Sequence, residues 1–526
     1  MATIVQNPIL KGFNPDPSFI FVEDSYYIAT STFEWNPGVQ IHFSKDLVNW
    51  DAVGVLGDKS YLNLTGIPSS GGVWAPCLSY NKEEKLFYLL YTNFKSSYQP
   101  PFRDLDNYLI TAPTVHGPWS DPVRLNCSGY DPFIFHDDDG KSYITNMIWD
   151  YRQEPEKRSA GIIIQEYDRQ QKRLVGKVST LFEGTELGQT EGPNIFKRNG
   201  YYYLMTAEGG PHYEHAVTLI RSKSIWGPYE LHPKRYILTS SGTDEDTLQK
   251  AGHASVCEDA DGNWYMAYLC ARPVKDGRCI LGRETAIQEV EWREDDWLYL
   301  KSENIYPADT FIVHRNVEKM DNSKTTYTFE DERFRKDFFT LREPYSKERF
   351  SIHDREGYLR IYGKESINSI IEQAIICRRQ TAMSFEAKTL LEFNPENFGH
   401  MAGIIYKYNE ANQYYFYMTY DETKAANVLA GIKIDRGQPT ILPQEEQPTL
   451  FSDKVYLKIV VNKEKGQFYY SLNDQEYIPV GGEFDTTICS DDYAYGFTGT
   501  MVGMACQDMS MHEHYADFKF FSYEDK

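Results

Sequence analysis

One phrase recurs five times along the N-terminal part of the chain, and it constrains the fold more than any other feature. Each copy reads as a short apolar strand, a charged or glycine-containing turn and an aromatic strand, as in YDPFIFHDDDGKSYITN. Corresponding residues of the copies are spaced by 59, 56, 61 and 61 positions; they are Pro17, Pro76, Pro132, Pro193 and Ala254. A long regular period with paired strands in every repeat is typical of a β-propeller. The repeats therefore predict five blades.

The heads of the five copies carry the polar side chains of interest. The innermost strands of a propeller run along a common axis, so we expect these heads to form one ring at a mouth of the channel. They are Asp16, Trp74, Asp131, Glu191 and His253. Aspartate before proline is also a common turn former, and a lone glutamate fits a structural ion pair. Acidic groups at the heads of three repeats favour a catalytic site over these alternatives.

The C-terminal part of the chain has a different pattern. Residues 1–310 hold the repeats, 311–324 form a linker without a repeat head, and 325–526 contain segments that alternate apolar and polar residues, such as VYLKIVVNK and GQFYYSLND. Alternation of this kind, broken by turn signals, is typical of an antiparallel β-sandwich. We found no long amphipathic helix, so the predicted chain is all-β, a five-bladed β-propeller followed by a concanavalin- or jelly-roll-like β-sandwich.

Composition excludes several kinds of partner. A chain of 526 residues is expected to form more than one domain. Its net charge of −22 argues against nucleic acid and anionic membranes as partners, because both would repel it. Eight scattered cysteines without CxxC pairs indicate reduced core thiols and neither a disulfide framework nor a zinc site. With no apparent signal peptide or long apolar run, we expect a cytoplasmic protein.

The motifs carry a resemblance to a known family. NPDPS, WAPCLSY, YDPFIFHDDDGKSY, TEGPNIF and LGRETAIQEVEW resemble glycoside hydrolase family 43, and most of all its intracellular β-xylosidases. The resemblance covers essentially the whole chain and implies a propeller followed by a C-terminal β-sandwich. In that family the aspartate of the first blade is the general base, the aspartate of the third tunes and orients, and the glutamate of the fourth is the general acid. The resemblance thus implies Asp16 as base, Asp131 as the tuning residue and Glu191 as acid.

Glycoside hydrolysis with inversion requires such a set of carboxyl groups. One carboxylate activates water and one protonated acid serves the leaving oxygen, at a separation of roughly 6.5–9.5 Å. Glu191 must hold a proton near neutral pH, and we expect an ionised Asp131 and burial in an aromatic pocket to raise its pKa. Asp16 must stay ionised.

Further pocket residues are predicted around the carboxyl groups. Arg283, in LGRET, resembles the arginine that the family places against substrate hydroxyls and the catalytic carboxylates; a salt bridge on a blade rim is the alternative. Trp74, Phe33 and Trp149 are candidates to pack on sugar faces, and the alternative for each is a place in the core.

The sequence leaves two roles open for His253, and it also bears on whether a cofactor is needed. A hydrogen-bonded channel histidine is the favoured role for His253, with ligation of a hard divalent cation such as calcium as the alternative. No phosphate loop, Ser-His-Asp arrangement or redox-cofactor motif is visible, so no organic cofactor is expected.

A segment of the second domain, residues 496–510 (GFTGTMVGMACQDMS), is expected to close the pocket. In the resembling enzymes a loop from this domain reaches over the propeller mouth, which leaves room for the terminal sugar alone. Met501 stands where we expect a bulky aromatic residue, and Asn194 follows EGP where histidine is frequent. Both departures bear on substrate preference.

These observations lead to one reading with two alternatives. We expect an inverting exo-β-1,4-xylosidase that releases xylose from the non-reducing end of small xylo-oligosaccharides. An α-L-arabinofuranosidase or a bifunctional enzyme is the first alternative, and a non-catalytic carbohydrate-binding protein is the second. The resemblance also implies a homo-oligomer.

Overall fold

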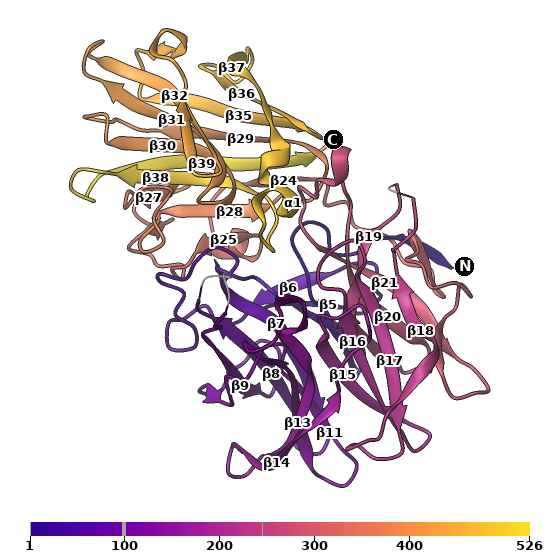
Figure 1. Cartoon of the computed structure of the whole chain (residues 1–526). Coiled ribbons are helices and arrows are strands. Elements are labelled where there is room, and N and C mark those ends of the chain that lie inside the picture. Colours follow the sequence, from indigo (N-terminus) through magenta and orange to yellow (C-terminus); the bar gives the residue numbers. More distant parts are fainter. Residues whose placement is uncertain (1, 97–100, 245) are drawn as a thin grey trace.

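The computed structural model describes residues 2–96, 101–244 and 246–526. Two β-rich domains lie against each other, with the propeller formed by the N-terminal part of the chain and the sandwich by the C-terminal part (Figure 1). Among the described residues no helix has the length and apolar character needed to cross a membrane.

The propeller has the five predicted blades, each a four-stranded antiparallel sheet in chain order. The strands are β2 (Ser18–Val22), β3 (Ser25–Thr30), β5 (Gln40–Ser44) and β6 (Asp51–Gly54) in the first blade; β7 (Gly72–Asn81), β8 (Leu86–Phe94), β9 (Leu105–Ala112) and β10 (Val123–Arg124) in the second; β11 (Phe133–His136), β12 (Ser142–Trp149), β13 (Ser159–Asp168) and β14 (Arg173–Phe182) in the third; β15 (Glu191–Arg198), β16 (Tyr201–Glu208), β17 (Ala216–Ser222) and β18 (Glu230–Thr239) in the fourth; and β19 (Gln249–Glu258), β20 (Trp264–Ala271), β21 (Glu284–Trp292) and β22 (Leu298–Leu300) in the fifth. The strand–turn–strand phrase of each repeat forms the two inner strands of its blade.

The ring closes without a strand shared between the first and last blades. Strand β1 (Thr3–Gln6) pairs antiparallel with β23 (Thr310–Val313). The hydroxyl of Ser255 in the fifth blade accepts from the backbone N–H of Phe19 at 2.9 Å and donates to the carbonyl of Pro17 at 2.6 Å. Because β23 continues past the predicted boundary at residue 310, the propeller keeps the start of the predicted linker.

The sandwich consists of two facing sheets. The eight-stranded sheet contains β24 (Lys324–Tyr327), β26 (Phe350–Ser351), β27 (Leu359–Tyr362), β29 (Ser384–Glu392), β35 (Lys454–Asn462), β36 (Lys465–Ser471), β37 (Ile478–Asp485) and β39 (Tyr515–Asp525). The nine-stranded sheet contains β25 (Phe338–Leu341), β28 (Ile375–Arg379), β30 (His400–Asn409), β31 (Asn412–Asp421), β32 (Ala426–Asp435), β33 (Gln438–Ile441), β34 (Thr449–Leu450), β38 (Met501–Asp508) and, from the propeller domain, β4 (Trp35–Asn36).

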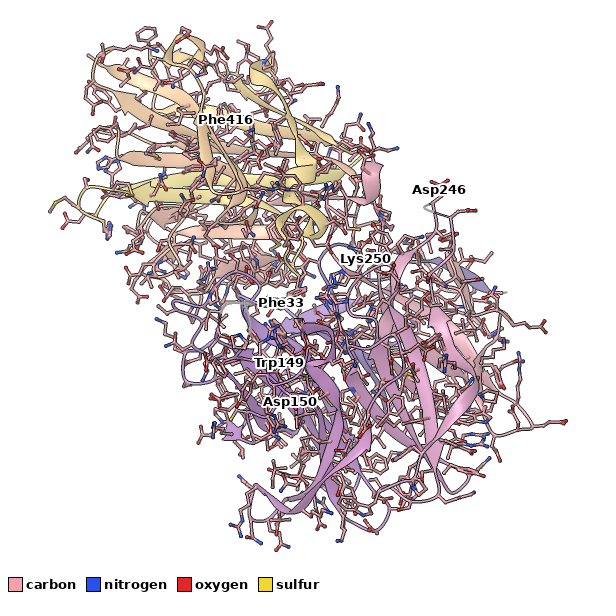
Figure 2. All side chains as sticks on the ribbon, viewed as in Figure 1. Phe33, Trp149, Asp150, Asp246, Lys250 and Phe416 are labelled. Carbon is pink, nitrogen blue, oxygen red and sulfur yellow. The ribbon has the colours of Figure 1, made fainter. Side chains whose placement is uncertain are left out.

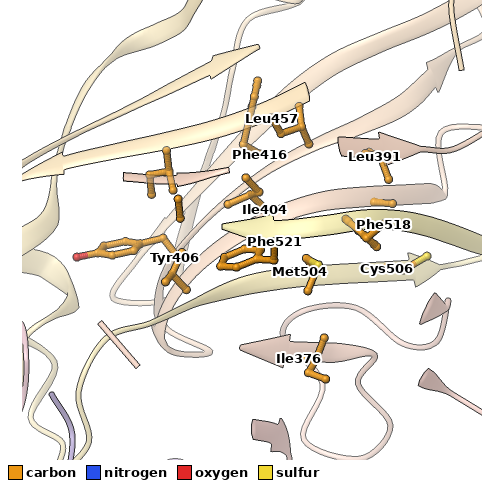
Figure 3. Packing of buried hydrophobic residues seen from close by; sticks show 14 of the residues in the cluster. Ile376, Leu391, Ile404, Tyr406, Phe416, Leu457, Met504, Cys506, Phe518 and Phe521 are labelled. Atoms are coloured by element: carbon orange, nitrogen blue, oxygen red, sulfur yellow. The ribbon is translucent and has the colours of Figure 1, made fainter. Parts of the chain in front are cut away.

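Alternating side chains build the core between these sheets. In β29 every second residue is buried, as expected for a strand with one face on a core. Ile404 and Phe416 of one sheet share an apolar cluster with Leu457 and Phe521 of the other (Figure 3). Short helical segments connect strands: η1 (Pro155–Lys157), η2 (Lys275–Gly277), η3 (Glu332–Lys336), η4 (Gln444–Glu446), η5 (Thr486–Cys489) and α1 (Asp491–Ala494).

The two domains share a sheet and a core. Residues Trp35 and Asn36 of β4 pair with Leu341 and Thr340 of β25, so the propeller adds a strand to the sandwich. A second apolar cluster contains residues of both domains, among them Phe33 and Trp35 of the propeller and Met501 of the sandwich. A shared sheet and core fix the sandwich relative to the propeller mouth.

Candidate active site

A pocket of about 220 Å³ opens where the inner strands of the blades converge. It is lined by Asp16, Phe33, Trp74, Ala75, Arg103, Tyr130, Asp131, Trp149, Pro155, Arg158, Ser159, Gln189, Glu191, Pro211, His253, Arg283 and Phe497. The structure therefore brings all five repeat heads to one cavity, together with Arg283 and the aromatic residues Phe33 and Trp149. Figure 2 shows Phe33 and Trp149 near the junction of the two domains.

The heads do not all occupy the same position of the repeat. The residue before each marker has a left-handed backbone in every blade; these residues are Asp16 (φ 56°), Ala75 (φ 35°), Asp131 (φ 57°), Gly192 (φ 58°) and His253 (φ 43°). Trp74 and Glu191 precede this position by one residue. Left-handed conformations cost little for glycine, are tolerated comparatively well by aspartate and histidine, and are strained for alanine. Five such residues in one ring turn the chain into each inner strand at the pocket.

Asp16 is held as an anion. Arg283 Nη1 donates to its Oδ1 at 2.9 Å, and the Ser31 hydroxyl donates to its Oδ2 at 2.6 Å. His253 Nδ1 lies 3.7 Å from Oδ1. Burial by itself would raise the pKa of Asp16, but the Arg283 charge, His253 and the Ser31 hydrogen bond outweigh it, so the pKa is lowered. An ionised, buried carboxylate of this kind is suited to act as a general base.

Glu191, the first residue of β15, has a pKa that is shifted in the opposite direction from that of Asp16. Burial and the charge of Asp16 raise its pKa to about 7, although Arg283, a hydrogen bond from Tyr130 and Arg103 oppose the shift. The Tyr130 hydroxyl donates to Glu191 Oε2 at 3.2 Å. A carboxyl group that holds its proton near neutral pH can act as a general acid.

Asp131 does not supply the charge that we expected. Burial, Glu191 and Asp16 raise the pKa of Asp131 well above its usual value, against the backbone N–H of Gly192, which donates to Oδ2 at 2.9 Å. The like charge that raises the pKa of Glu191 is that of Asp16. Our expectation of an ionised Asp131 in that role is therefore corrected, because Asp131 is too deeply buried beside two carboxyl groups to ionise readily.

Aromatic side chains of both domains form the walls. The rings of Trp74 and Phe497 lie 5.7 Å apart at 75°, and those of Phe33 and Phe497 lie 6.2 Å apart at 25°. Trp74 also stacks on Phe94, with ring centroids 4.0 Å apart. Phe497 comes from the sandwich segment just before β38, so the second domain contributes one wall of a pocket whose carboxyl groups belong to the first.

Met501 does not line the pocket, which corrects our prediction for this residue. It is the first residue of β38, pairs with Arg379 and Lys407 of the neighbouring strands and is fully buried in the shared apolar cluster. The predicted segment does reach the pocket, but through Phe497, four residues earlier. The aromatic residue in GFTG was the available sequence signal.

Trp149 and two residues that the sequence analysis missed complete the lining of the pocket. The indole N–H of Trp149 donates to the carbonyl of Pro101 at 2.8 Å, and the Arg103 guanidinium lies 4.2 Å from the Trp149 ring. Arg103 stands between β8 and β9, where no repeat signal exists. Tyr130 directly precedes Asp131, and only the hydroxyl contact with Glu191 shows its role.

Among the described residues, His253 is not part of any group of three or more His, Cys, Asp or Glu side chains whose ligand atoms lie close enough together to hold an ion. The one His/Cys/Asp/Glu group there that is close enough to hold an ion is Cys279, Asp491 and Asp492. Lys250 Nζ already lies 3.2 Å and 2.6 Å from these two carboxylates.

Asn194 lines a separate channel cavity of about 20 Å³ behind the carboxyl groups, room for about one water molecule.

Comparison with known proteins identifies the family. Residues 5–298 match the model of glycosyl hydrolases family 43. The chain belongs to this family. Residues 326–524 of this family 43 protein match the model described as the beta xylosidase C-terminal concanavalin A-like domain. The two matches cover the propeller and the sandwich that the sequence predicted.

Several relatives match this family 43 chain over nearly its whole length. It is 42% identical to a xylosidase/arabinosidase 43B of Humicola insolens, over 99% of this chain and 97% of the relative. It is also 42% identical to a beta-xylosidase of Bacillus subtilis strain 168, over 99% of this chain and 100% of the relative. The crystal structure of a xylan beta-1,4-xylosidase from Bacillus halodurans C-125 superimposes with a TM-score of 0.95 at 44% identity, covering 99% and 100% of the two chains.

Proposed function

We propose that this family 43 enzyme is an inverting, exo-acting β-1,4-xylosidase that releases xylose from the non-reducing end of xylo-oligosaccharides. The observation that carries the proposal is a pair of carboxyl groups that line one pocket and have opposite pKa shifts, Asp16 lowered and Glu191 raised to about 7. Two carboxyl groups in different protonation states are what acid–base glycoside hydrolysis requires. The names of the relatives at 42% identity support xylosides as substrates.

In this mechanism each carboxyl group moves one proton. Asp16 accepts a proton from a water molecule, and the water oxygen forms a bond to the anomeric carbon of the terminal sugar. Glu191 gives its proton to the glycosidic oxygen as the bond between that oxygen and the anomeric carbon breaks. The attack comes from the face opposite the leaving group, so the anomeric configuration inverts.

The exo mode rests on the wall from the sandwich. Phe497 of the sandwich faces Trp74 and Phe33 of the propeller, and Trp149, with the Arg103 guanidinium over its ring, lines the same pocket. A pocket walled in this way takes the last sugar of a chain and directs the rest of the oligosaccharide outward.

Three measurements test the proposal. Proton NMR of the first-formed sugar should show the inverted anomer, and the retained anomer would contradict Asp16 as a base. Side-by-side kcat/KM values on aryl β-D-xylopyranoside and aryl α-L-arabinofuranoside should favour the xyloside. Glu191→Ala should abolish turnover of xylobiose while binding of xylose persists, whereas a non-catalytic binding protein would turn over neither substrate in the wild type.

A bifunctional xylosidase/arabinofuranosidase is the second candidate. One specific observation favours it: a relative at 42% identity over 99% of this chain is named a xylosidase/arabinosidase. Comparable kcat/KM values on the two aryl glycosides would select this candidate without changing the assignment of the carboxyl groups.

We further propose a cytoplasmic homo-oligomer that needs no organic cofactor. Seven of the eight cysteines are buried, which suits a reducing compartment. Cell fractionation and sedimentation velocity measure location and assembly. Turnover after dialysis against EDTA should persist, and its loss with recovery on adding calcium would instead indicate a channel cation.

A further inference from the structure

A serine that does not line the pocket contacts two of its walls. Ser70 lies between β6 and β7, is buried, and has a left-handed backbone with φ 62°. Its carbonyl accepts a hydrogen bond from the indole N–H of Trp74 at 2.9 Å. Its Oγ accepts one from the backbone N–H of Phe497 at 3.0 Å. One residue thus links the propeller wall and the sandwich wall.

Ser70 is itself fixed from both domains. Its backbone N–H donates to Oε2 of Glu34 at 3.0 Å, and Glu34 is 1% exposed. The hydroxyl of the preceding residue, Ser69, donates to Glu410 of the sandwich. The Ser70 hydroxyl is therefore presented to Phe497 from a backbone that has little freedom to move.

The backbone carbonyl of Phe497 is held as well, by the arginine that binds Asp16. Its carbonyl accepts from Arg283 Nη2 at 3.2 Å, and Nη1 of the same guanidinium binds Asp16. A shift of the Phe497 loop would move the ring that faces Trp74. The ring spacing of 5.7 Å therefore depends on the hydrogen bond at each side of this loop.

We propose that Ser70 is a positioning residue that sets the spacing of the Trp74 and Phe497 walls and thereby the affinity for the terminal sugar. The proposal rests on the function proposed above and adds a residue that acts through both walls without touching substrate. Because both walls contact the sugar before and during the reaction, loosening them weakens ground-state and transition-state binding alike.

Two variants separate the hydroxyl from the backbone. Ser70→Gly and Ser70→Ala both lose the acceptor for Phe497 and keep the carbonyl for Trp74, but only glycine favours the left-handed backbone. Loss of one hydrogen bond predicts that KM for aryl xyloside and Ki for xylose both rise about threefold to tenfold in each variant. We expect kcat to change less than about twofold and the alkaline limb of the pH profile to stay in place. A Ser70→Gly enzyme with wild-type KM and Ki would overturn the proposal.

Two controls distinguish positioning from general destabilisation. Ser222→Ala removes another buried serine hydroxyl, at the end of β17, that accepts from the backbone N–H of Ser224, and this change should leave KM and Ki unchanged. In a Phe497→Ala background, Ser70→Gly should add no further loss of affinity, since its acceptor acts through that loop. A fully additive loss would contradict the proposal.

A binding measurement that needs no turnover separates this proposal from the proposed function. Xylose binding followed by tryptophan fluorescence needs no turnover, so a wild type that binds xylose without hydrolysing glycosides would refute the proposed function and still report the effect of Ser70. A wild type that binds no xylose would overturn both.

Discussion

Removal of one hydroxyl group tests where the catalytic proton is held. Tyr130 donates to Glu191 Oε2 at 3.2 Å, and this bond lowers the pKa of Glu191 because it stabilises the carboxylate form. Tyr130→Phe keeps the ring, which meets Trp74 edge-on with centroids 5.2 Å apart. The pKa of Glu191 should therefore rise while the shape of the pocket is preserved.

The size of the shift follows from the geometry. A hydrogen bond to a charged group contributes about 1.5–3 kcal/mol, and a length of 3.2 Å places this one at the bottom of that range. A contribution of about 1.4 kcal/mol corresponds to roughly one pKa unit. Because Glu191 must be protonated to act, kcat/KM should fall as pH rises through its pKa of about 7 in the wild type. In Tyr130→Phe this alkaline limb should lie about one unit higher.

The assay is the pH dependence of kcat/KM on xylobiose, whose leaving group needs acid assistance. This ratio reports ionisations of the free enzyme, the state that the structure describes. Tyr91→Phe is the matched control, because the Tyr91 hydroxyl, from β8 of the second blade, donates to the Tyr61 carbonyl and not to a carboxyl group of the pocket. An alkaline limb that stays in place or moves to lower pH in Tyr130→Phe would refute Glu191 as the group that carries the proton.

Four other variants test the pocket and the domain interface beside it. Glu191→Gln should lose about 10²–10⁴-fold in kcat on xylobiose but far less on an activated aryl xyloside, whereas Asp16→Asn should lose heavily on both; equal losses for Glu191→Gln on the two substrates would contradict its role. Arg283→Met removes the main cation beside Asp16, so the pKa of Asp16 and with it the acid limb of kcat/KM should move to higher pH, and an unmoved limb would assign the base elsewhere. Lys250→Met leaves the buried Asp491 and the half-buried Asp492 of α1 without their cation, which should cost about 3–5 kcal/mol in denaturant unfolding of the domain interface, and an unchanged unfolding midpoint would show that the ion pairs contribute nothing.

The architecture of the propeller could be predicted because each repeat encodes its own inner strands. The turn and the aromatic strand recur in every copy and form the first two strands of each blade. The outer strands carry no such signal, since several are short; β10 has two residues and β22 has three. They form because the preceding strand offers an open edge, which is a property of the sheet and not of the local sequence.

The carboxyl groups could be predicted as a set, but their ionisation could not. Asp16 and Asp131 occupy the same left-handed position in their blades and are both buried, yet their pKa values shift in opposite directions. The difference comes from Arg283, which precedes β21 in the fifth blade and binds Asp16 directly. A contact between residues 267 positions apart in the chain depends on closure of the ring.

The wall from the sandwich depends on a different kind of contact. Two glycines let the loops of the two domains lie backbone to backbone: a Cβ on Gly282 would lie 2.4 Å from the Thr498 carbonyl oxygen, and one on Gly499 would lie 2.4 Å from the Leu281 carbonyl oxygen. This approach sets how deeply Phe497 enters the pocket. The sequence of β38 and the loop before it does not specify the height at which this loop meets the propeller, which is why the sequence alone points to Met501 and not to Phe497.

The origin of the two sets of residues suggests how specificity and chemistry are separated in this enzyme. The carboxyl groups to which we assign the proton transfers lie at the starts of inner strands of the blades, and their pKa values are set by neighbours within the propeller. The wall that we expect to select the sugar includes Phe497 from a loop of the other domain, whose backbone is held by Ser70 and Arg283. Because these hydrogen bonds go to the backbone N–H and the backbone carbonyl of Phe497 and not to its side chain, the aromatic ring can be replaced without loss of either bond. Substrate range can therefore change at this position while the carboxyl groups keep their ionisation.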